Sequence, residues 1–142
     1  MLKINLKYSI ATLLLFLIEM IIALFVRDDF IRPYGGDFLV VILIYCFVKS
    51  FLGTPVLRTA ISVLAFAYLI EMLQYFQIVH HLGWDQSRIA NILIGNYFTW
   101  VDMLAYTLGI AFVVVTEKLR LVNYKKTNSN TAKTEEILHF FI

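Results

Sequence analysis

The sequence predicts an all-α integral membrane protein: a four-transmembrane-helix bundle with a short interfacial or re-entrant helix between the third and fourth helices. Of its 142 residues, 61% are hydrophobic and only 15% are charged, whereas charged residues make up roughly 25% of a typical soluble domain. The mean hydropathy is +0.79. The apolar residues also fall into runs separated by glycine, proline and charge, which is typical of several membrane helices.

Four apolar runs set the expected helices, over residues 8–26, 38–52, 56–76 and 100–116. A run of about 20 residues is long enough to span the hydrocarbon core. The first run has no small-x-small cleavage site after it, so we expect a retained helix rather than a signal peptide. Residues 1–117 are then the transmembrane domain, and residues 118–142 form a cytoplasmic basic and polar tail. The apolar end of that tail, ILHFFI, receives no role.

The connection between the first two helices is rich in turn formers. Pro33 and the pair Gly35-Gly36 are expected to break any helix there. Asp37 then stands where an N-cap would begin the second helix. A ligand-facing role for Asp37, beside Arg32, is the alternative.

The connection before the fourth helix is too long for a simple turn. Within it, residues 87–95 are typical of a short helix with Ser87 as its cap and Gly95 as its stop. It is too short to span a membrane, so we expect it at the interface or as a re-entrant piece. Thr99 is expected to cap the fourth helix, with Asp102 in a capping-box position.

Carboxylates occur where a membrane helix tolerates them least. Glu71 and Gln74 are three apart and so share one side of the third helix. Asp102, Tyr106 and Gly109 form a similar stripe on the fourth. A charge in the membrane costs at least about 2.5 kcal/mol on insertion scales, so such residues usually face the protein interior. We expect the two stripes to face each other.

Basic residues set the orientation, because they concentrate on the cytoplasmic side. With a cytoplasmic amino terminus, nine of the twelve basic residues lie inside: Lys3, Lys7, Lys49, Arg58, Lys118, Arg120, Lys125, Lys126 and Lys133. The remaining three, Arg27, Arg32 and Arg88, lie outside. Both termini are therefore expected in the cytoplasm.

This topology predicts a polar cluster under the outer surface. Its expected members are Asp37, Glu71, Gln74 and Asp102 from the helices, with Arg32 and Arg88 from the loops. Opposite charges would hold one another ionised. One interpretation is a ligand site, and the other is an ion-pair network that holds the loops against the bundle.

Three strings, FIRPYGGDFLVVILIYCFVKSF, IEMLQYF and FTWVDMLAYTLG, resemble an uncharacterised bacterial membrane family, domain of unknown function 2809, which is similar to the VanZ-like group. The resemblance covers roughly residues 8–116. The polar pattern of VanZ-like proteins falls on Glu71, Gln74, Arg88 and Asp102 here. The group is linked to glycopeptide-antibiotic resistance without a settled molecular activity, so the resemblance implies architecture and a place in the bacterial cell envelope more than chemistry.

Three functions stay open. The leading hypothesis is a small inner-membrane protein whose polar cluster binds a membrane lipid or a lipid-linked or polar envelope molecule. The second is a proton-coupled transporter acting as a homodimer, with Glu19 as its proton site, although Glu19 could instead pair with a neighbouring helix. The third is a non-catalytic accessory subunit of a larger membrane complex.

Other functional classes find little support in the sequence. A net charge of +2, without basic residues interleaved with exposed aromatics, gives no indication of nucleic-acid binding. His80 and His81 are adjacent, which does not suit two ligands on one helical face, so we predict no metal and no cofactor. No pairing of nucleophile and base stands out, and whether the protein is an enzyme stays open.

Overall fold

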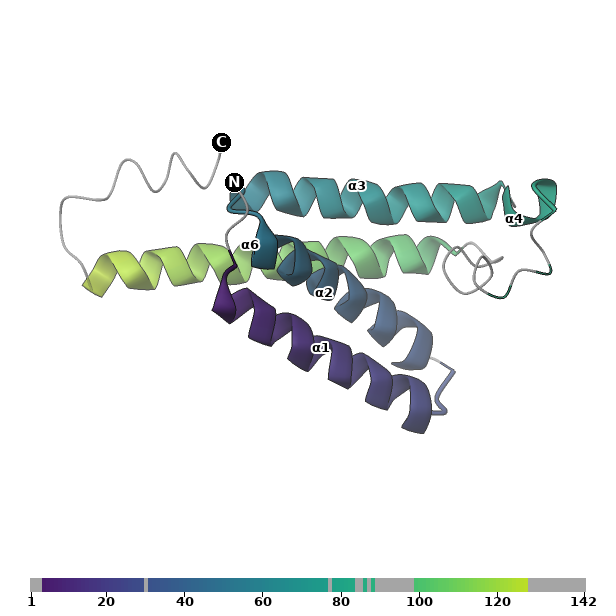
Figure 1. Cartoon of the computed structure of the whole chain (residues 1–142), viewed down its shortest axis with the longest axis horizontal. Coiled ribbons are helices and arrows are strands. Elements are labelled where there is room, and N and C mark those ends of the chain that lie inside the picture. Colours follow the sequence, from purple (N-terminus) through teal and green to yellow (C-terminus); the bar gives the residue numbers. More distant parts are fainter. Residues whose placement is uncertain are drawn as a thin grey trace.

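The computed structural model describes residues 4–29, 31–76, 78–83, 86, 88 and 99–127. Within these residues, four long helices form the molecule (Figure 1): α1 (Leu6–Phe25), α2 (Gly36–Phe51), α3 (Val56–Tyr75) and α6 (Trp100–Thr127). A π-helical segment, η1 (Ile31–Gly35), leads into α2, and one helical turn, α4 (Ile78–His81), follows α3. The prediction of four helices long and apolar enough to cross a membrane is confirmed, with mean hydropathies between 1.5 and 2.3.

The first three helices begin and end within two residues of the predicted bounds. The fourth helix differs, because α6 continues to Thr127 instead of ending near Thr116. Its extension contains no glycine or proline, and leucine, lysine, arginine and glutamate all favour helix. Charge therefore marks where a membrane span should end, but it does not end the helix. The predicted short helix over 87–95 lies outside the described residues except for Arg88, as does the tail from residue 128.

The segment before α2 corrects a second prediction. Residues 31–35 are helical and run directly into α2, so Pro33 and the Gly35-Gly36 pair do not interrupt the helix as predicted. Pro33 lies in the first turn of this segment, where its missing N–H needs no partner. Asp37 is consequently the second residue of α2, and its side chain does not act as the cap predicted for it.

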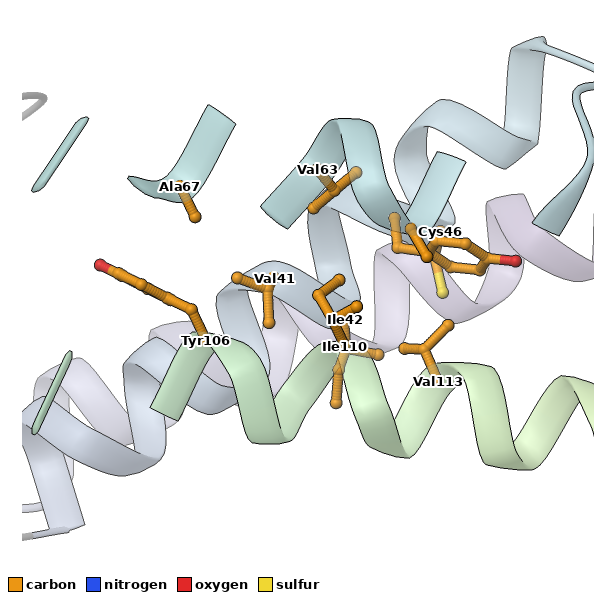
Figure 2. Packing of buried hydrophobic residues seen from close by; sticks show 10 residues of the cluster. Val41, Ile42, Cys46, Val63, Ala67, Tyr106, Ile110 and Val113 are labelled. Carbon is orange, nitrogen blue, oxygen red and sulfur yellow. The ribbon is translucent and has the colours of Figure 1, made fainter. Parts of the chain in front are cut away.

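The core forms around α2, which packs against α1, α3 and α6. Figure 2 shows its side chains meeting those of α3 and α6 in a continuous apolar row. In lipid, such packing is driven by close van der Waals contact, which small residues permit. The buried residues of the row are Val41, Ile42, Tyr45, Cys46, Ala60, Val63, Ala67, Tyr106, Ile110 and Val113.

Helices α2 and α6 approach each other closely at Gly109. A Cβ atom built there would lie 2.6 Å from the Phe38 carbonyl oxygen and closer still to Val41 Cγ2. Real Cβ atoms do not tolerate such distances from backbone, so only glycine lets α6 approach α2 this closely. This approach brings the beginning of α6 against the beginning of α2.

In contrast, α1 contributes no fully buried residue. It lies against α2 and runs beside it in the antiparallel direction (Figure 1). At its amino end, the Asn5 side chain caps the helix by accepting a hydrogen bond from the Lys7 N–H at 3.2 Å. The Asn5 N–H in turn donates to the Ser50 carbonyl at 2.8 Å, which fastens the start of α1 to the end of α2.

Candidate functional site

Three carboxyl groups from three helices meet at one end of the bundle. Because neighbouring helices run in opposite directions, the start of α2, the end of α3 and the start of α6 lie together (Figure 1). Asp37, Glu71 and Asp102 come from these three points, and Tyr106 lies among them. We call these four residues the carboxyl cluster.

Tyr106 joins the carboxyl groups. Its hydroxyl donates to Glu71 Oε1 at 3.0 Å and also lies 3.4 Å from Asp37 Oδ1. The Asp102 carboxyl, one turn before Tyr106 on α6, lies close enough to Asp37 and Glu71 to interact with both electrostatically. The cluster therefore places three carboxyl groups around one hydroxyl donor.

Burial in the cluster is deepest at Glu71, which is 1% exposed. Its Oε2 atom is also buried and has no hydrogen-bond partner among the described residues. Tyr106 is buried as well, whereas Asp37 and Asp102 are half-buried. An unpartnered buried carboxyl oxygen costs stability. The site thus contains an acceptor position that a ligand or a bound proton could fill.

The two arginines expected at this site form no ion pair with it among the described residues. Arg32 lies on η1 and Arg88 in the connection after α4, and both side chains are exposed. Gln74 lies one turn beyond Glu71 on α3 and is half-buried. The carboxylates are thus gathered without the two guanidinium groups.

Local contacts hold the start of α6 in place. The Asp102 N–H donates to Thr99 Oγ1 at 3.2 Å, which is the N-cap predicted for this helix. One turn beyond, the Thr107 hydroxyl bonds the Tyr68 hydroxyl of α3. The cap leaves the Asp102 side chain available to Asp37, so its position in the capping box and its place in the cluster are compatible.

Glu19 forms a separate site on α1. Its side chain is half-buried, and Oε1 has no hydrogen-bond partner in the described part of the chain. Its Oε2 atom lies 3.7 Å from where a Cβ of Gly36 would be. Glu19 therefore packs against the first residue of α2, without a described hydrogen bond to the carboxyl cluster.

Sequence reasoning missed two features. Tyr106 was placed on a polar stripe four residues after Asp102 but received no role, although that spacing puts both on one side of α6. A second polar group lies at the other end of the bundle, where the Tyr8 hydroxyl donates to Glu117 Oε1 at 2.5 Å. In the sequence, this second polar group is indicated by the position of Glu117 directly after an apolar run.

Metal binding finds no support in the described residues, where no group of three histidine, cysteine, aspartate or glutamate side chains is arranged to hold an ion. Each of the three carboxyl groups can accept hydrogen bonds and attract positive charge. What the carboxyl cluster can do chemically is therefore to bind protons, ammonium groups or hydroxyl donors.

A family profile described as "Protein of unknown function (DUF2809)" matches residues 26–110, more than half of the chain. The protein belongs to this family. The matched region contains the whole carboxyl cluster, but it leaves out all of α1 and the part of α6 after Ile110. No solved structure matches the chain. The family description assigns no activity.

Proposed function

We propose that this protein is a small multi-pass membrane protein whose carboxyl cluster binds the donor-bearing polar part of a membrane lipid or a lipid-linked or polar envelope molecule. The observation that carries the proposal is the meeting of three carboxyl groups around Tyr106, with the Glu71 Oε2 atom buried and unpartnered among the described residues.

The energetics favour a ligand over a purely structural role. A carboxyl group in a membrane helix costs at least about 2.5 kcal/mol unless it finds a partner. Here each carboxyl has other carboxyls as neighbours, and their mutual repulsion adds to that cost. A structural contact between α3 and α6 already exists in the Tyr68–Thr107 hydrogen bond. A bound ammonium group would offset the repulsion, and either an ammonium or a hydroxyl group could donate to the vacant acceptor.

The surroundings suit a zwitterionic or phosphate-bearing headgroup. Arg32 is on η1, which leads directly into the helix that carries Asp37, and its side chain is exposed. A headgroup with its amine or hydroxyls on the carboxyls would leave its anionic part for Arg32 or Arg88.

The positive-inside rule supports an orientation with both termini in the cytoplasm and the carboxyl cluster toward the outer face. We propose a place in the bacterial inner membrane on the basis of the VanZ-like pattern that the sequence indicates at Glu71, Gln74, Arg88 and Asp102. Two members of this set, Glu71 and Asp102, lie in the carboxyl cluster.

Native mass spectrometry tests the proposal directly. The purified protein is compared with Glu71→Gln, which keeps the shape of the side chain and removes its charge, and with Arg88→Ala. The matched control is Glu117→Gln, which makes the same change at the other end of the bundle. We expect a co-purifying species with amine or hydroxyl groups that Glu71→Gln loses and Glu117→Gln retains. Unchanged bound species in Glu71→Gln and Arg88→Ala would refute the proposal and favour an accessory subunit.

A proton-coupled transporter is the second candidate, and Glu19 supports it. This lone carboxyl of α1 has a buried oxygen without a described partner, as expected of a residue that gains and loses a proton. Substrate-dependent proton uptake into liposomes is the test. Glu19→Gln should abolish that uptake, and a flux equal to that of the wild-type protein would rule this candidate out.

A further inference from the structure

A cavity of about 180 Å³ opens at the end of the bundle opposite the carboxyl cluster. It lies between α1, α2 and α6, and its lining includes Lys7, Tyr8, Ala11, Tyr45, Phe112 and Arg120. We call it the Tyr8 pocket. For comparison, an engineered apolar cavity of roughly 150 Å³ is large enough to hold benzene. The Tyr8 pocket therefore has room for a short segment of a ligand and not for a large molecule.

A residue in the wall of this cavity carries a hydroxyl without a described partner. Tyr45 lines the pocket and is only 1% exposed, and its buried hydroxyl has no hydrogen-bond partner among the described residues. Its ring packs edge-on against Tyr8, with ring centroids 6.3 Å apart, which fixes its position. Because buried hydroxyls are nearly always hydrogen-bonded, the Tyr45 hydroxyl is a donor next to the pocket for which the described residues supply no acceptor.

The mouth of the pocket carries excess positive charge. Lys49 Nζ and Arg120 Cζ lie 5.6 and 5.9 Å from the centroid of the Tyr8 ring, and Lys7 also lines the pocket. The one carboxylate there, Glu117, already accepts from the Tyr8 hydroxyl at 2.5 Å and pairs with Arg120 at 3.3 Å. Two cations that line the pocket, Lys7 and Arg120, thus outnumber its one described carboxylate, and Lys49 beside Tyr8 adds positive charge nearby, which leaves the mouth attractive to an anion.

We propose that the Tyr8 pocket binds one anionic phospholipid. The lipid phosphate lies between Lys7 and Arg120, and an ester carbonyl accepts a hydrogen bond from the Tyr45 hydroxyl. The first methylenes of an acyl chain contact the apolar wall formed by Ala11 and Phe112. A membrane leaflet supplies this ligand at high concentration, and basic residues next to a membrane attract its anionic lipids. This site is independent of the carboxyl cluster.

The test compares two lipids that share the phosphodiester and the acyl chains and differ in headgroup, one anionic and one zwitterionic. The purified full-length protein is delipidated in detergent and given phosphatidylglycerol or phosphatidylcholine with identical acyl chains. Bound lipid is counted by native mass spectrometry, and protection is followed as the midpoint of thermal unfolding. We expect a preference of about tenfold for phosphatidylglycerol, because the choline ammonium of phosphatidylcholine is repelled by Lys7 and Arg120.

Three variants locate the binding. The double variant Lys7→Gln with Arg120→Gln should lose the preference between the two lipids. Tyr45→Phe should weaken the retention of both lipids several-fold, while Tyr124→Phe, at an exposed position on α6, should behave as the wild type. Because Tyr45→Phe removes only an unpartnered hydroxyl, it should fold even where the double variant does not, and its unfolding midpoint verifies this.

Three outcomes would overturn the proposal. One is equal retention of the two lipids by the wild-type protein. Another is retention by Tyr45→Phe that equals the wild-type level. The third is protection by inorganic phosphate as strong as that by phosphatidylglycerol, which would identify the ligand as a free anion.

Discussion

The two ends of this helix bundle have opposite electrical character. At one end, Asp37, Glu71 and Asp102 gather around Tyr106 with no basic side chain in ion-pair contact among the described residues. At the other end, Lys7 and Arg120 line the Tyr8 pocket together with Glu117, and Lys49 lies over the Tyr8 ring. Each end contains a deeply buried residue with an oxygen that has no described partner: Glu71 with Oε2 at the first end, and Tyr45 with its hydroxyl at the second. One bundle thus presents an acceptor site and a donor site about a helix length apart, so the two ends should take ligands of opposite charge.

The largest expected effect comes from breaking the packing that both ends depend on. Gly109→Ala places a Cβ 2.6 Å from the Phe38 carbonyl oxygen, so α2 and α6 must move apart. We expect a loss of about 3 kcal/mol or more in the free energy of unfolding, at the upper limit for overpacking. Thermal or denaturant unfolding in detergent measures it. Gly53→Ala is the matched control, because a Cβ there meets nothing within 4 Å; equal stability of the two variants would contradict the close approach at Gly109.

Next in size is a change confined to the carboxyl end. Tyr106→Phe removes the hydroxyl that contacts Glu71 and Asp37, and leaves a buried carboxyl without its donor. We expect a loss of about 2 kcal/mol, since a hydrogen bond to a charged group contributes about 1.5–3 kcal/mol. Urea-induced unfolding in mixed micelles provides the measurement. Lipid retention at the Tyr8 pocket should stay at the wild-type level, and a parallel loss there would mean that the two ends are coupled.

A smaller effect is expected at the basic end. Tyr8→Phe removes the hydrogen bond to Glu117, which joins α1 to α6. This bond is half-buried, so we expect a loss of about 1 kcal/mol. Proteolysis of α1 under native conditions should also accelerate, because α1 has no fully buried residue to hold it. Cleavage of α1 at the wild-type rate would show that this bond does not fasten the helix.

The smallest effect on stability is expected at Tyr45, whose hydroxyl has no described partner, in contrast to the hydrogen-bonded Tyr8. In lipid-free detergent, Tyr45→Phe should leave the free energy of unfolding unchanged or raise it by up to about 1 kcal/mol, because it removes a buried hydroxyl that has no partner. Differential scanning calorimetry of Tyr45→Phe beside Tyr8→Phe makes the comparison. A clear loss of stability in Tyr45→Phe would mean that its hydroxyl is bonded in the lipid-free protein.

The sequence predicts some parts of the fold and of the carboxyl cluster better than others. Helix number and the first three helices follow from apolar runs, because hydrophobic length is a local property. The polar spacings of Glu71 and Asp102 indicated which faces turn inward. Asp37 was misjudged as a cap because local turn formers suggested a break, whereas η1 absorbs Pro33 in its first turn.

The remaining features depend on contacts between distant segments. Tyr106 is central because α2, α3 and α6 converge on it, which no local pattern reveals. The Tyr8 pocket needs α6 to extend beyond residue 116, where charge suggested that the helix would end. In the sequence, Tyr45 is a polar residue within an apolar run, and nothing local marks it as functional. Its position beside a cavity becomes evident only in the structure.

A double-mutant cycle between Asp37→Asn and Glu71→Gln tests the central claim, that carboxyl groups from separate helices meet, most directly. Each change removes one partner of a repulsive pair, so the free energies of unfolding should be non-additive by at least about 0.5 kcal/mol. The control cycle pairs Asp37→Asn with Glu117→Gln at the other end, and it should be additive. Additive effects in both cycles would contradict the carboxyl cluster, and with it the proposed site.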